Sequence, residues 1–182
     1  MRKRNESLIR LRNLVISLAI FAALVFYAST YAEPVLRVSV MPDESPPVLR
    51  RKLLPLTDFL EKKIGIKLEF RPMRDSDALV EALVNHQLDM VWIDGSNLAR
   101  AVTRSNGGVT PLVQREWDEK TGYDDHTWTV RADMDVKLRQ KLTDAFLALN
   151  RDKAQDKAIL ALQHARGFIP AKVAVHPVRP NP

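Results

Sequence analysis

The sequence contains no cysteine and little of the chemistry that most enzymes use. The lack of cysteine excludes disulfides, thiolate nucleophiles and cysteine-based metal sites. The four histidines are widely spaced, and there is no glycine-rich phosphate loop, nucleophile elbow or metal-spaced histidine pair. The residues therefore indicate no catalytic site, and we expect neither enzyme activity nor a cofactor.

The sequence also lacks an apolar run of the roughly 20 residues that an ordinary membrane span needs. The apolar segment from Leu14 to Ala28 follows a basic stretch and precedes small residues up to Ala32. This order predicts a secretory signal peptide over residues 1–32, export to the periplasm and a mature chain of residues 33–182. An uncleaved N-terminal anchor is the alternative, and the missing cysteine excludes a lipid anchor.

The chain has little excess charge once this segment is set aside. Its formal net charge is +6, but residues 1–32 carry five bases and one acid, which leaves +2 for the rest. The high isoelectric point is thus no evidence for nucleic-acid binding. The 150 residues from 33 to 182 suffice for one ordinary domain.

Strand and helix patterns then alternate along the chain. Strands are predicted at 35–41, 66–71, 88–93, 109–116 and 127–131, and helices at 46–64, from 75 or 76, at 96–104, from 135 and at 152–167. This order predicts an α/β fold with a mostly parallel five-stranded sheet, one antiparallel return strand at 127–131, and helices on both faces. A single α/β domain follows.

Open α/β sheets bind ligands at the carboxyl ends of their parallel strands. The buried strand at 88–93 ends there in a turn composed of Asp94, Gly95, Ser96 and Asn97. This turn is compatible with two interpretations, a set of backbone N–H groups presented to an anion or an ordinary helix cap.

Two further clusters have the same ambiguity. Asp43, Glu44 and Ser45 precede the first helix, where the acids favour an amine or a metal over phosphate, and solvated capping is the simpler interpretation. Asp124, Asp125 and His126 have metal-binding side chains, but three adjacent residues seldom face one ion. We therefore predict no metal site.

Several segments, taken together, resemble one family. The family is the periplasmic phosphate/phosphite/phosphonate-binding proteins of ABC importers, which have a type II periplasmic-binding-protein fold. The resembling segments are Leu36–Glu44, Pro55–Ile66, Val80–Leu83, Gln87–Trp92, Trp128–Asp133, Ala145–Leu149 and Gly167–Ala171.

The resemblance implies a second α/β lobe, and this chain has no room for it. The lobe is inserted in the family where this chain has only residues 117–126, so we expect a single lobe. Family members hold the ligand partly with two aromatic residues of the first lobe, and the matching positions here are Ser76 and Ile93. Ser76 is open to two interpretations, an oxyanion ligand or a helix cap.

Two classes of function follow from the resemblance. In the first, the protein is an exported binding component of a phosphate/phosphite/phosphonate-type ABC transporter that binds a small anionic solute weakly. Its expected partners are then an ABC permease or a second copy of the chain. In the second, it is an accessory or protein-interaction module, or a decayed remnant, that no longer captures solute.

Overall fold

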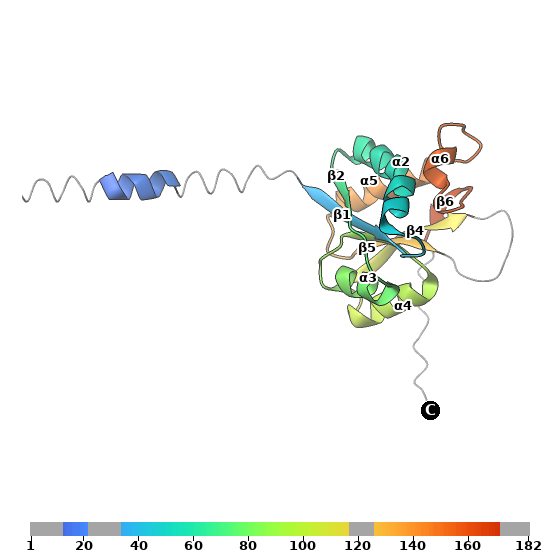
Figure 1. The fold of residues 1–182 in the computed structure, drawn as a ribbon, viewed down its shortest axis with the longest axis horizontal. Helices are drawn as coiled ribbons and strands as arrows, with labels where there is room; N and C mark the ends of the chain where they lie inside the picture. The colour runs from blue at the N-terminus through green and yellow to red at the C-terminus, as the bar shows by residue number, and fades with distance from the viewer. Residues whose placement is uncertain (1–12, 22–33, 117–125, 172–182) are drawn as a thin grey trace, which may run out of the picture. The chain divides into compact units, whose positions relative to one another are not determined.

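The computed structural model describes residues 13–21, 34–116 and 126–171. The chain divides into two compact units, Met1–Pro34 and Val35–Pro182. In the first unit, residues 13–21 form an exposed helix (Figure 1). Within the described ranges, no helix is long and apolar enough to cross a membrane. Most of the predicted signal peptide, including its cleavage site, lies outside the described residues.

The second unit contains one six-stranded sheet in the order β2-β1-β3-β5-β4-β6. Its strands are β1 (Val35–Val40), β2 (Lys67–Phe70), β3 (Met90–Ile93), β4 (Val109–Glu116), β5 (Thr127–Arg131) and β6 (Gly167–Pro170). The predicted α/β class and return strand β5 are confirmed. The sheet differs from the predicted mostly parallel, five-stranded sheet in two ways. β6 adds a sixth strand, and β5 inserts between β3 and β4. As a result, only the β1–β2 and β1–β3 pairs are parallel.

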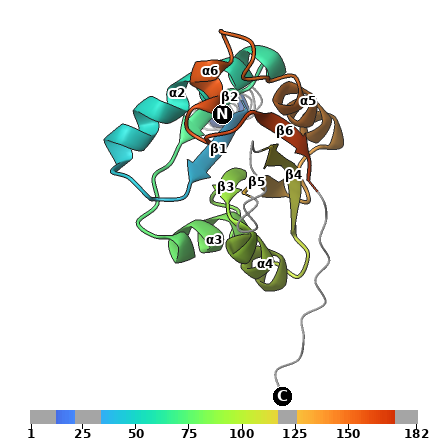
Figure 2. The ribbon, with the colours of Figure 1, turned by 90° about the vertical axis from the view of Figure 1, so that its right-hand side faces the viewer.

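Helices cover both faces of this sheet (Figures 1 and 2). They are α2 (Pro46–Ile64), α3 (Ser76–Val84), α4 (Gly95–Arg104), α5 (Val136–Leu147) and α6 (Lys157–Leu160). α2, α5 and α6 lie over one face, and α3 and α4 over the other. The helix predicted over 152–167 is wrong in extent, because only α6 forms and Gly167 begins β6 instead.

The central strand β3 separates two hydrophobic cores. Met90 and Trp92 pack into the core beneath α2 and α5, whereas Val91 and Ile93 pack into the core beneath α3 and α4. All four residues are buried, as expected for a strand covered on both faces.

Both ends of the second unit contribute to the larger core. Leu142 and Phe146 of α5 are fully buried there with Leu53 and Leu60 of α2. The sequence pattern of the C-terminal helices predicts this packing on the sheet, and the structure confirms it. The β1–β3 region and the C-terminal region therefore share one core.

Local sequence sets the ends of α2. Ser45 precedes it in an extended conformation, Pro46 and Pro47 occupy its first turn, and Gly65 ends it with a left-handed φ of 73°. A proline at position 55 within this segment predicts either a kink or a late start of the helix. A late start does not occur, because the helix runs continuously from Pro46 to Ile64.

Candidate functional site

The N-termini of three helices lie along one edge of the sheet. α2, α3 and α4 follow β1, β2 and β3, and these strands are parallel neighbours, so their carboxyl ends share that edge. The antiparallel pairing of Ile93 with Thr127, and of Gln114 with Thr127, brings the start of β5 and the end of β4 to the same edge. We call this the carboxyl edge, and it contains the predicted site segments.

At the N-terminus of α4, Asp94 accepts one first-turn backbone N–H and two side-chain donors. The Asp94 carboxylate accepts hydrogen bonds from the Asn97 backbone N–H at 2.8 Å, the Ser96 hydroxyl at 2.7 Å and the Asn97 side-chain amide at 2.8 Å. Burial disfavours the ionised carboxylate, but these hydrogen bonds outweigh it and hold the pKa of Asp94 below its ordinary value. The turn is a self-capped helix start with a negative charge at its centre.

Asn97 connects this turn to two neighbouring segments. Its buried side-chain amide lies 3.8 Å from the Met41 sulfur and so contacts the loop after β1. Its side-chain oxygen accepts a hydrogen bond from Arg100 at 3.0 Å, and Arg100 also pairs with Asp77 of α3. Gly95 is exposed, and a Cβ atom there would meet nothing within 4 Å. Asn97 therefore has a structural role, and Gly95 lies in open space.

The N-terminus of α3 is capped in the same way. Asp75, not Ser76, is the cap, and its carboxylate accepts a hydrogen bond from the Ala78 N–H at 2.7 Å. This bond is the main reason why the pKa of Asp75 lies below its ordinary value. Ser76 is the first helical residue and is half-buried.

The N-terminus of α2 offers few backbone donors. Pro46 and Pro47 have no N–H group, and the N–H groups of Val48 and Leu49 donate to the Ser45 carbonyl at 2.9 and 3.0 Å. The Ser45 side chain makes no capping bond. In the exposed loop before it, residues 43–44, Glu44 pairs with Lys52 at 2.5 Å.

Ile93 does not face this edge. Its side chain is fully buried in the core beneath α3 and α4. The structure thus brings the segments at 43–45, 76 and 94–97 to one edge, and it leaves Ile93 in the interior.

A cluster of Trp92, Arg115 and His126, which the sequence pattern does not indicate, lies beside Asp94. The His126 ring stacks on Trp92 with centroids 5.4 Å apart, and the buried Arg115 guanidinium lies 5.9 Å from the centre of the Trp92 ring. Arg115 also contacts His126 Nδ1 at 3.2 Å and donates to the Gln163 carbonyl at 2.8 Å. His126 contributes to the lowered pKa of Asp94 through its charge.

His126 lacks the setting of a metal ligand in the described structure. Asp124 and Asp125, its sequence neighbours, lie outside the described residues. Among the described residues, no group of three or more His, Cys, Asp or Glu side chains is placed to hold a metal ion.

Comparison with known proteins shows what this chain resembles. No curated protein matches the sequence significantly. A family model of the phosphonate-binding periplasmic substrate-binding proteins of ABC transporters matches residues 38–125, which include the second half of β1, the strands β2 to β4 and the predicted site segments. Over these residues, the chain is similar to the phosphonate-binding proteins.

Several solved structures share this fold. PhnD1 from Prochlorococcus marinus, in complex with methylphosphonate, matches with a TM-score of 0.66 and 13% identity over 76% of this chain and 93% of its own. The binding-protein component of a phosphonate ABC transporter from Pseudomonas aeruginosa matches with a TM-score of 0.62 and 12% identity over 76% and 82%. XAC2383 from Xanthomonas citri, bound to chloride, matches with a TM-score of 0.62 and 13% identity over 76% and 92%. At these identities, the likeness establishes the fold.

Proposed function

We propose that the protein is an exported substrate-binding-protein-like component of a phosphate/phosphite/phosphonate-type ABC transporter, and that it binds a small anion weakly. The observation that carries this proposal is the family match over residues 38–125, the region that builds most of the carboxyl edge. Export follows from the predicted signal peptide, and an ABC permease is the partner that this role implies. The scaffold has a binding rather than a catalytic role.

Weak affinity follows from the single lobe. Residues 117–126 alone connect β4 to β5, so a second α/β lobe does not fit between them. Two-lobed binding proteins close around a ligand, exclude water and so strengthen each electrostatic contact with it. One lobe leaves one side of the anion hydrated, unless a second copy of the chain covers the edge.

The small number of hydrogen-bond donors at the carboxyl edge also supports weak affinity. Asp75 and Asp94 cap α3 and α4 with their own carboxylates, and two prolines remove N–H groups from α2. A helix N-terminus that already holds a carboxylate attracts a second anion only weakly. Arg115 and His126 are therefore the groups we propose for contact with the solute, over the face of Trp92.

Titration calorimetry tests the proposal with methylphosphonate, phosphite and phosphate. We expect the monomeric protein to bind at least one of them with a dissociation constant of about 1 mM or weaker. His126→Ala should weaken this binding severalfold because it removes a donor at the carboxyl edge. His86→Ala is the matched control, since His86 lies just before β3 at the opposite edge and should leave binding unchanged. Submicromolar binding by a demonstrated monomer would overturn the proposal of weak affinity.

A protein-interaction or accessory role is the second candidate. The self-capped starts of α3 and α4 favour it, because they stabilise the fold without offering groups to a solute. Absence of saturable binding of all three anions, together with copurification of a specific protein partner, would support this second role.

A further inference from the structure

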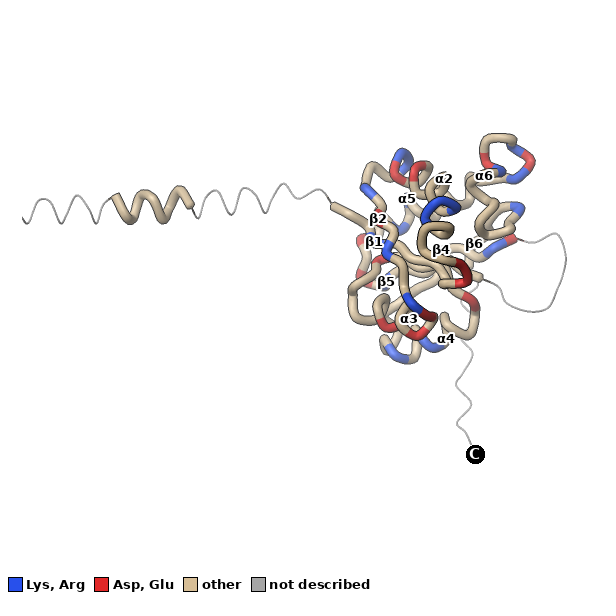
Figure 3. Tube along the Cα trace, viewed as in Figure 1, with Lys and Arg blue, Asp and Glu red and all other residues tan. Residues whose placement is uncertain are grey.

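Positive charge is distributed unevenly over the two faces of the sheet. The helices α2 and α5, which lie over one face, together carry eight basic and three acidic residues, a formal charge of +5. The helices α3 and α4, over the other face, carry two of each and are neutral. Residues 33–182 as a whole have a formal charge of only +2, so the positive charge is concentrated in the layer of α2 and α5. Figure 3 shows the Lys and Arg positions on α2 and the mixed signs at α3 and α4.

The cations of the α2 and α5 layer lack carboxylate partners. On the opposite face, Arg100 and Arg104 of α4 pair with Asp77 and Glu81 of α3. On α2 and α5, by contrast, six exposed cations form no ion pair with any residue that the structure describes. They are Arg50, Arg51, Lys62, Lys63, Lys137 and Lys141. We call these six residues the basic face.

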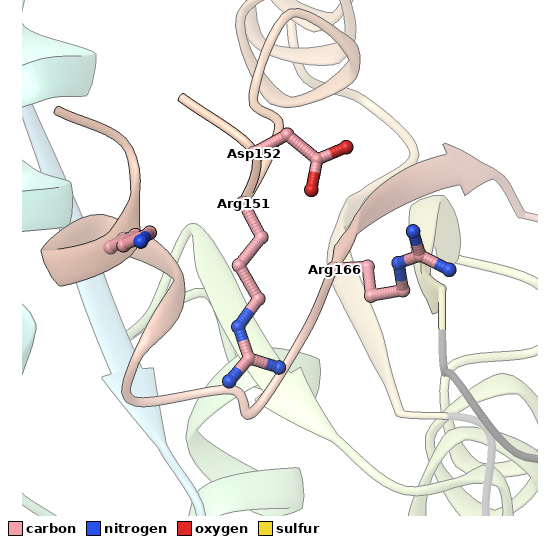
Figure 4. Close-up of a pocket in the computed structure, with 4 residues that line it drawn as sticks. Arg151, Asp152 and Arg166 are labelled. Carbon is pink, nitrogen blue, oxygen red and sulfur yellow. The ribbon is translucent and has the colours of Figure 1, made fainter. Parts of the chain in front are cut away.

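The two helices contribute to one continuous surface. Lys63 of α2 and Lys141 of α5 line the same open groove, of about 270 Å³, together with Asp144, Ala145 and Ala148. A hollow beside α6, which lies over the same face of the sheet, adds three further cations and one carboxylate (Figure 4). The two arginine side chains drawn there point apart, so this hollow extends the positive surface and does not form a converging site.

Exposed apolar side chains lie on the same two helices. Leu54 is 54% exposed on α2, and Val136 and Leu147 are 68% and 38% exposed at the two ends of α5. A surface that combines basic and apolar side chains is typical of proteins that lie on a membrane. The apolar groups enter the headgroup region there, and the cations attract anionic lipids.

We propose that the basic face docks onto an anionic phospholipid bilayer. A negatively charged leaflet attracts each Lys or Arg near its surface, and this attraction decays within a Debye length of about 8–10 Å. The protein therefore binds such a leaflet with the layer of α2 and α5 toward it. A fluid leaflet fits these cations better than a folded protein partner does, because lipid phosphates can move to meet charges spread over two helices. This role goes beyond solute binding and does not require it.

Vesicle cosedimentation of the chain of residues 33–182 tests the charge requirement. The N-terminal unit is left out because its apolar run would bind vesicles by itself, and both hydrophobic cores lie within Val35–Pro182. We expect binding to phosphatidylglycerol vesicles, and none to phosphatidylcholine vesicles, at about 0.1 M salt. Arg51→Gln/Lys62→Gln should weaken this binding at least about fivefold, because it removes two cations of the basic face.

Lys67→Gln/Arg104→Gln is the matched control, since it also removes one Lys and one Arg charge. Lys67 alternates with the buried Leu68 on β2 and so points away from α2, and Arg104 belongs to α4. We expect this control to change vesicle binding by less than about twofold. All four substituted side chains are exposed, so both variants should keep the fold, which urea denaturation checks.

A fluorescent dye on a single introduced cysteine tests the orientation, because the chain has no cysteine of its own. Leu54→Cys on α2 and Val102→Cys on α4 replace exposed apolar side chains on opposite faces of the sheet. On phosphatidylglycerol vesicles, an environment-sensitive dye should shift its emission to shorter wavelength at position 54 and not at position 102. Equal binding to the two lipids, equal losses in the two double variants, or equal shifts at the two positions would overturn the proposal.

Discussion

At the scale of single residues, one buried carboxylate joins three strands at the edge opposite the carboxyl edge. Asp89 is 5% exposed and accepts hydrogen bonds from the Arg37 side chain and backbone, each at 2.8 Å. Arg131 of β5 lies 3.3 Å from the same carboxylate. Burial disfavours ionisation, but the hydrogen bonds and charges of Arg37 and Arg131 outweigh it and lower the pKa of Asp89.

We therefore predict that Asp89→Asn lowers the free energy of unfolding at pH 7 by about 2–4 kcal/mol, because it leaves two arginines without their shared anion. Since the pKa of Asp89 is lower in the folded state, its contribution is complete above the unfolded-state value of about 4 and is lost at more acidic pH. The difference between wild type and variant should therefore narrow below about pH 4. Chemical denaturation across pH measures this effect.

Glu69→Gln is the control for this prediction. Glu69 pairs with Arg71 at 3.1 Å, but both side chains are nearly half exposed. Exposed pairs contribute at most about 1 kcal/mol, so we expect a smaller change than for Asp89→Asn. Equal losses in the two variants would show that the Asp89 network has no special structural role.

At the scale of elements, α3 and α4 act as a paired unit on one face of the sheet. Arg100 and Arg104 of α4 pair with Asp77 and Glu81 of α3. The two helices bury Leu79, Leu83 and Ala101 against β3. Because α4 has only 10 residues, its stability depends on these contacts and on its cap.

We predict that Asp94→Ala destabilises the protein by about 1 kcal/mol through loss of the cap of α4. Amide hydrogen exchange should become faster in the first turns of α4 and change little in α2. Asp94→Ser is the matched variant, because serine also caps helices well and should retain most of the stability. Equal destabilisation by alanine and serine would mean that the Asp94 charge, rather than capping, is what stabilises this turn.

At the scale of the whole molecule, the strands that precede residue 126 do not form the complete sheet. β5 lies between β3 and β4, and β6 pairs with β4 at the end of the sheet, so two of the six strands come from after residue 126. Aromatic contacts also connect the two parts of the chain. The Trp128 ring stacks on the Phe146 ring with centroids 5.5 Å apart, and its centroid lies 5.4 Å from that of the Trp92 ring.

We predict that a fragment of residues 33–125 does not unfold cooperatively. It would lack the strand between β3 and β4, and it would expose the core face of α2 that α5 covers in the whole protein. Circular dichroism and tryptophan fluorescence during urea denaturation measure this, with the chain of residues 33–182 as the control. A single sharp transition in the fragment would show that its core is complete without β5 and α5.

Local features of the sequence determined the ends of several elements. The predicted bounds of β4, β5 and α2 agree with the structure, because strand alternation, Pro46 and Gly65 act within a few residues. The cap at Asp135 was also predicted from the sequence, since a cap bonds to an N–H only three residues away, whereas the turn at 94–97 was compatible with either a cap or an anion site.

Only the tertiary structure decided the features that depend on strands distant in sequence. Val113 pairs with Pro170, so β6 exists as a strand because β4 offers it an edge, and its short sequence alone does not indicate one. Cross-strand register likewise places His126 on Trp92 and Arg115 beside both. The sequence by itself determined where α2, β4 and β5 begin and end, because those signals are local. The contacts of Arg115 and His126 depended on which strands lie next to each other, and strand pairing is set by packing across the whole sheet.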